Sequence, residues 1–196
     1  MLKRYLVLLL LPATAYAGPF GLVSRGDTVY FSAGQSIRNQ HGHSVFRSLE
    51  YEMTGRSSRV PRWLRSYDLG ARIGYSAVRQ ARSWFGYRFG DPDDQVRAES
   101  LYIFGRRERS NAASIRPYFD FGSGPMWSNR RIPAATSRLN FSSQLVFGVV
   151  TFASSRTPLR VGYRFSHVSN AGLTRRNPGL AVHTFFVGAT IRKTSR

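Results

Sequence analysis

Two side chains near the C-terminal end of the chain have the types and the spacing that suit ester hydrolysis. His167 and Ser169 stand two positions apart in the stretch YRFSHVSNAGLTRRNPG, which runs from Tyr163 to Gly179. On a β-strand, residues i and i+2 share one face with backbones about 6.6 Å apart, so an imidazole can reach a neighbouring hydroxyl. A histidine base can make a serine nucleophilic toward an ester. On the H-x-S pattern alone, a polar pair that only hydrogen-bonds to its surroundings is the simpler interpretation.

The strand that must carry this pair is one of a series. Period-two alternation of apolar and polar residues recurs along the chain, and clusters of Gly, Pro, Asn, Asp and Ser interrupt it. No amphipathic helix of any length competes with this pattern. The alternating segments number eight and lie at about 28–37, 44–53, 66–77, 97–107, 115–124, 138–152, 159–169 and 180–192.

The polar faces of these segments carry charges of both signs, whereas the opposite faces are aliphatic and aromatic. A soluble sandwich would bury its apolar faces and present its polar faces to water. Charged side chains on one set of faces suit the interior of a closed barrel whose exterior meets lipid. We therefore predict an all-β fold, an eight-stranded antiparallel transmembrane β-barrel. The predicted interior residues are Glu50, Glu52, Asp68, Arg72, Arg116, Asp120, Asn140, Gln144 and Arg164.

Export across a membrane is predicted from the first residues. Lys3 and Arg4 precede a short apolar block, and Ala15 and Ala17 form an A-x-A cleavage pattern. We predict a signal peptide over residues 1–17 and the barrel domain over 18–196. The alternative is an uncleaved anchor, but the block is much shorter than the ~20 residues that span a bilayer. The chain has no cysteine, which excludes disulfides and thiol chemistry.

The charge of the chain suggests a phosphate-rich partner. The formal charge is +19, and every basic residue except Lys3 and Lys193 is an arginine. Arginine binds phosphate bidentately. Nucleic acid is the usual partner of so basic a chain, but export and the absence of a nucleic-acid-binding motif argue against it. The lipid A part of lipopolysaccharide carries phosphates, so we expect lipopolysaccharide in the outer membrane as the partner.

The predicted topology orients the His-Ser pair. With both chain ends in the periplasm, the connections at about 38–43, 78–96, 125–137 and 170–179 are extracellular. On the seventh strand, His167 and Ser169 share the outward face with Tyr163 and Phe165, which puts the pair at the outer rim of the barrel. One feature fits less well, because the periplasmic stretch TGRSSRVPRWLR is long for a turn.

The stretch from Tyr163 to Gly179 resembles the signature of the outer-membrane lipid A 3-O-deacylases, the PagL-like family. In that family an F-x-H-x-S-N-A-G run precedes an Asn-containing loop, and the specific part of the likeness covers about twenty residues. The resemblance implies an eight-stranded barrel that hydrolyses the ester-linked 3-hydroxyacyl chain at the 3-position of lipid A, without a cofactor. It implies Ser169 as nucleophile and His167 as general base. Asn177 and the backbone around Gly172 would hold the oxyanion, and Asn170 would shape the turn.

One position departs from the family pattern. The acidic residue that would orient the histidine falls at Ala181 in this chain. Loss of the acid from a Ser-His-Asp triad costs about 10⁴ in kcat. The surviving enzyme hypothesis is a Ser-His dyad aided by Asn170 or a loop carbonyl, with His183 on the same outward face and able to contact His167. The alternative is a non-catalytic barrel of the same family that binds lipopolysaccharide or stabilises the envelope.

Other chemistry has weaker signals. His41 and His43 form an H-G-H pattern in the first extracellular connection, which is more typical of a solvated loop than of a metal site. The acidic turn at Asp91 to Asp94 could bind Ca²⁺, although a plain turn is the simpler interpretation. We predict no metal or nucleotide cofactor. The sequence leaves open whether the barrel forms a homodimer.

Overall fold

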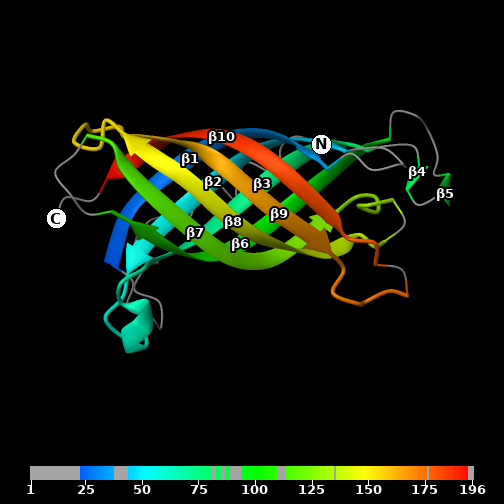
Figure 1. The fold of residues 1–196 in the computed structure, drawn as a ribbon, viewed down its shortest axis with the longest axis horizontal. Helices are drawn as coiled ribbons and strands as arrows, with labels where there is room; N and C mark the ends of the chain where they lie inside the picture. The colour runs from blue at the N-terminus through cyan, green and yellow to red at the C-terminus, as the bar shows by residue number, and fades with distance from the viewer. Residues whose placement is uncertain are drawn as a thin grey trace, which may run out of the picture.

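The chain folds into a closed barrel of eight antiparallel strands (Figure 1). The computed structural model describes residues 23–37, 44–80, 83–84, 87–88, 94–109, 114–134, 136–175 and 177–193. The barrel strands are β1 (Val23–Ser36), β2 (Val45–Arg56), β3 (Asp68–Arg79), β6 (Gln95–Glu108), β7 (Arg116–Ser128), β8 (Leu139–Thr151), β9 (Leu159–Ser169) and β10 (Leu180–Lys193). Each barrel strand pairs with the next one along the chain, and β1 pairs with β10 to close the wall.

The predicted fold class is confirmed, with shifts at the strand ends. β1 begins at Val23 rather than at residue 28, because its register shifts next to Gly26 and again after Asp27. Such a bulge breaks the period-two pattern that marks a strand in a sequence. The predicted connection at 78–96 contains a short two-stranded sheet of β4 (Ser83–Trp84) and β5 (Tyr87–Arg88). The predicted signal peptide at 1–17 lies outside the described residues and stays a prediction.

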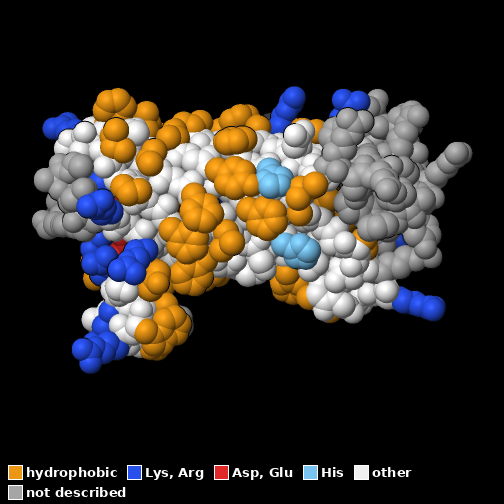
Figure 2. All heavy atoms as spheres, in the orientation of Figure 1, with side chains coloured by type: hydrophobic (Ala, Val, Ile, Leu, Met, Phe, Trp, Pro, Cys, Tyr) orange, Lys and Arg blue, Asp and Glu red, His pale blue; other side chains and the backbone are white. Residues whose placement is uncertain are grey.

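Apolar side chains cover the outside of the barrel wall. Phe31, Phe147 and Phe185 are each more than half exposed, and Figure 2 shows hydrophobic side chains spread over the wall between the two ends. So much exposed aromatic surface would be unfavourable in water, but it is what a lipid bilayer covers. None of the helices in the described part of the chain is both long and apolar enough to cross a membrane.

The inside of the barrel is held by a network of buried ion pairs. Glu52, which is 1 % exposed, accepts hydrogen bonds from Arg106 Nη1 at 2.6 Å and from Arg72 Nε at 3.0 Å. Arg106 also donates through Nε and Nη2 to the two carboxylate oxygens of Asp120, both at 2.7 Å. A second bidentate pair joins Arg164 to Glu50 at 2.8 and 2.7 Å. These residues come from five different strands, so the network ties the wall together across the interior.

Aromatic rings and aliphatic side chains fill the space around these charges. The guanidinium of Arg106 lies 4.6 Å from the centre of the Tyr118 ring, and that of Arg72 lies 5.1 Å from the centre of the Tyr30 ring. Apolar side chains including Phe46, Met126 and Val182 form a separate buried cluster. The interior is therefore a packed core and not an open channel.

We predict that Glu52→Gln destabilises the barrel by about 3–5 kcal/mol, because it leaves the charges of Arg72 and Arg106 buried with less compensation. The measurement is the urea dependence of folding in lipid vesicles. A suitable control is Arg130→Gln, which removes the exposed partner of the Arg130–Asp94 pair and should change stability by less than about 1 kcal/mol. Equal effects of the two substitutions would contradict a structural role for the network.

Candidate active site

The end of β9 presents the His-Ser pair on the outside of the barrel. Arg164, Ser166 and Val168 are buried and point inward, whereas His167 is exposed and Ser169 is half-buried. The outward orientation predicted from the period-two pattern therefore holds. His167 and Ser169 lie near the end of the barrel opposite the start of β1, close to the connection at 170–179.

The register of the neighbouring strands decides what flanks His167. Ala181 of β10 lies opposite His167 on one side, and Ser143 of β8 lies opposite it on the other. The position where the family pattern has its acid is thus directly beside the imidazole. The side chain of alanine supplies neither a charge nor a hydrogen bond to the imidazole. Nor do β8, β9 and β10 contain any Asp or Glu.

A polar line crosses the apolar wall at the height of His167. Ser143 Oγ lies 3.1 Å from Ser123 Oγ of β7, and the two residues are register partners. Sequence reasoning missed these serines. A signal was present, because Ser123 stands between Phe121 and Pro125, and Ser143 between Phe141 and Leu145, in the outward phase of their strands.

The connection after β9 is built on hydrogen bonds of Asn170. This residue is fully buried, and its side chain accepts from the N–H of Gly172 at 2.9 Å and donates to Thr174 Oγ1 at 2.6 Å. Its backbone N–H donates to Asn177 Oδ1 at 3.0 Å. These bonds hold the loop after β9, and none of them directs the side chain of Asn170 to His167.

The two loop residues expected to hold an oxyanion differ in what they can offer. The N–H of Gly172 is engaged by Asn170 in this structure. Asn177 is exposed and uses its Oδ1 atom, and its Nδ2 group has no hydrogen-bond partner within the described ranges. The amide of Asn177 is the donor that stays available.

Gly179 fixes the position of the imidazole by close approach. A Cβ at this position would lie 2.9 Å from His167 Cε1 and 3.3 Å from Nε2, so only glycine lets the ring sit where it does. Gly179 also has φ +67°, in the left-handed region that side chains disfavour. Within the described part of the chain no hydrogen bond joins His167 to Ser169. Catalytic contacts of this kind are often long before substrate binds.

The other predicted residues lie away from the pair or outside the described residues. His183 bonds through Nδ1 to the hydroxyl of Tyr163 and packs on Phe165, and within the described residues no hydrogen bond joins it to His167. These partners follow from the register, because His183 lies opposite Phe165 and Ala181 lies opposite His167. His41, His43, Asp91 and Asp93 lie outside the described residues. Asp94 pairs with Arg130 and with Gln80.

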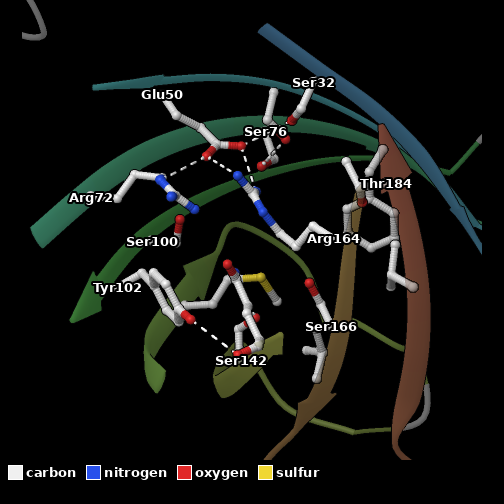
Figure 3. A pocket seen from close by; sticks show the side chains of 16 residues that line it. Ser32, Glu50, Arg72, Ser76, Ser100, Tyr102, Ser142, Arg164, Ser166 and Thr184 are labelled. Carbon is white, nitrogen blue, oxygen red and sulfur yellow. Dashed lines mark hydrogen bonds and ion pairs between the residues drawn. The ribbon is translucent and has the colours of Figure 1, made fainter. Parts of the chain in front are cut away.

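A cavity of about 60 Å³ lies inside the barrel on the other side of the same wall (Figure 3). It is lined by Ser166 of β9 together with Glu50, Arg72 and Arg164, which bond to one another. His167 and Ser169 are not part of its lining, because successive residues of a strand face opposite sides. This cavity therefore belongs to the packed interior and not to the candidate active site.

Comparison with known proteins decides the family. A sequence model described as lipid A 3-O-deacylase (PagL) matches residues 49–190, which is most of the chain. The chain belongs to the lipid A 3-O-deacylase family. No curated protein sequence matches it. The family match extends far beyond the stretch that first suggested the resemblance, and it includes both His167 and Ala181.

Solved structures confirm the fold of this lipid A 3-O-deacylase family member. The outer membrane enzyme PagL is 20% identical, with a TM-score of 0.58 over 82% of this chain and 97% of PagL. Neisserial surface protein A is 13% identical, with a TM-score of 0.56 over 88% of this chain and 99% of its own. Both likenesses are of fold. With the family, they identify the chain as an outer-membrane β-barrel protein, and long connections on such barrels face outward.

We predict that Gly179→Ala displaces the His167 ring and lowers any activity that depends on it by at least about tenfold, as a misplacement near 1 Å does. The matched variant is Gly172→Ala. Gly172 has φ +81°, yet a Cβ there would meet nothing within 4 Å. The rate difference between the two variants isolates contact with the imidazole from backbone strain. Equal losses would contradict the positioning role of Gly179.

Proposed function

We propose that this protein is a lipid A 3-O-deacylase that removes the ester-linked 3-hydroxyacyl chain from the 3-position of lipid A in the outer leaflet. The observation that carries the proposal is the place of His167 and Ser169. The pair lies on the lipid-facing wall near the outer end of β9, where an ester just below the sugar of lipid A would lie. Family membership supplies the substrate class.

In the proposed reaction Ser169 Oγ attacks the ester carbonyl while His167 takes its proton. The carbonyl oxygen becomes an oxyanion, which the Nδ2 group of Asn177 stabilises by donating a hydrogen bond. Such a donor is worth about 2.7–4 kcal/mol in the rate. The tetrahedral intermediate collapses, and His167 returns the proton to the departing sugar oxygen. Water, activated by His167, then attacks the acyl-serine ester, which releases the fatty acid and restores Ser169.

Arginines at the outer end of the barrel support a phosphorylated substrate. Arg130, Arg138 and Arg175 are exposed in the connections on that side, and Trp127 is exposed at the end of β7. Guanidinium groups pair with phosphate, and an indole suits the boundary between head groups and acyl chains. This arrangement would hold the sugar phosphates above the wall while the acyl chains lie along it.

The proposed mechanism is a dyad, because Ala181 cannot orient His167. Ring placement then depends on the contact with Gly179 and on the neighbouring hydroxyl of Ser143. Ala181 also favours a second function, a non-catalytic barrel that binds lipopolysaccharide through the same arginines. A serine-reactive probe separates the two, because labelling of Ser169 that is lost in His167→Ala requires an activated nucleophile.

We predict that the refolded barrel removes one 3-hydroxyacyl group from lipid A and that Ser169→Ala does not. The reason is that Ser169 is the serine that shares the outward face of β9 with His167. Mass spectrometry of lipid A after incubation makes the measurement, with the fold of both proteins verified first. Unchanged lipid A from the folded wild-type barrel would favour the non-catalytic alternative.

We predict that Ala181→Glu raises kcat, because the new carboxylate would stand opposite His167 and stabilise the imidazolium. The acid of a complete triad contributes up to about 10⁴ in kcat. Ala181→Gln is the control for size and hydrogen bonding, and should give a much smaller gain. A carboxylate variant no faster than the glutamine variant would show that this position does not limit the reaction.

A further inference from the structure

The connection between β2 and β3, residues 57–67, differs from the other connections at its end of the barrel. That end holds the start of β1 and the end of β10, and Figure 1 shows the connection projecting sideways from the wall. It is longer than the connections at 109–115 and 152–158 on the same side. Turns on the periplasmic side of such barrels are ordinarily short. Neither the barrel wall nor the proposed active site accounts for it.

This segment, which we call the periplasmic shelf, is held by its own hydrogen bonds and by packing. It contains a 3₁₀ turn at Arg62–Leu64, closed by bonds from Leu64 N to Pro61 O and from Tyr67 N to Leu64 O, both 2.9 Å. Val60 is buried inside it. The ring of Tyr67 packs edge-on against Phe121 of β7 at 5.5 Å between centroids. The shelf is thus held against the outer wall of the barrel.

The exposed residues of the shelf combine one large aromatic with basic side chains. Trp63 is 68% exposed, and Arg59, Arg62 and Arg65 are exposed around it. Residues 57–67 contain no Asp or Glu. In Figure 2 the projection carries hydrophobic side chains on the side toward the lipid-facing band of the wall and basic side chains at its far end. That polarity matches the order of acyl chains and head groups in a leaflet.

We propose that the periplasmic shelf docks on the inner leaflet of the outer membrane and binds anionic phospholipid head groups. Its position beside the lipid-facing band leaves the bilayer as the surface that Trp63 meets. An indole prefers the head-group boundary, because its ring is apolar and its N–H needs a polar partner. The three arginines complement phosphodiester charge. Because the shelf lies at the opposite end from His167, this inference is independent of the proposed deacylase activity.

Tryptophan fluorescence tests the proposal. The reporter is the full chain carrying Trp84→Phe and Trp127→Phe, which leaves Trp63 as the one tryptophan. The barrel is folded into vesicles of phosphatidylglycerol and phosphatidylcholine in which only one lipid class carries brominated acyl chains. We expect a blue-shifted emission and quenching that is strongest for bromines close to the head group. We also expect several-fold stronger quenching when the brominated lipid is phosphatidylglycerol.

The control variant adds Arg59→Gln, Arg62→Gln and Arg65→Gln to the reporter. It should still be quenched, but equally by the two brominated lipids, because the aromatic contact remains and the charge is gone. Emission typical of an indole in water, without quenching, would overturn docking. Equal quenching by both lipids in the reporter itself would overturn selectivity for anionic head groups. Bromine quenching is read only on protein that shows the folded-barrel mobility in gels, so a misfolded variant is recognised.

Discussion

The buried ion pairs at the centre of the barrel are the interaction on which the rest of the structure depends. Glu52 and Asp120 hold Arg72 and Arg106 across the interior, and Glu50 holds Arg164. Charges of this kind are costly to bury unless each one meets its partner at close range. A slip of one strand by a single residue would turn its charged side chains outward into lipid and leave the partners inside uncompensated. The network therefore specifies the register of the strands as well as closing the wall.

That register creates the candidate active site on the opposite side of the wall. Arg164 and His167 belong to the same strand, so fixing the inward residue also fixes the outward one. Once β8 and β10 are in place, Ser143 and Ala181 must flank His167. The polar line from Ser123 to His167 is thus a consequence of pairing across three strands. On a largely apolar wall, this polar line gives a lipid ester a polar region to meet.

The two ends of the barrel present similar side chains to their surroundings. At the outer end, exposed arginines and Trp127 surround the connections near His167. At the periplasmic end, Trp63 and its neighbouring arginines project on the shelf. In both places an indole accompanies guanidinium groups, a combination that suits the boundary between acyl chains and phosphate. The excess of arginine over the whole chain, which first suggested a phosphate-rich partner, is distributed over two surfaces and a buried network.

Period-two alternation and the motif from Tyr163 to Gly179 sufficed, from the sequence alone, to predict eight strands, a polar interior and an outward His167 and Ser169. These features are local, since the direction of a side chain depends only on its place along its own strand. The tertiary structure decided the other features: the bulge at the start of β1, the β4–β5 sheet, the contact of Gly179 with His167 and the partner of His183. Each of them depends on which residues of distant segments come to lie opposite one another. Backbone pairing and the compensation of buried charges determine which residues lie opposite one another. Neither can be predicted from the pattern of a single strand.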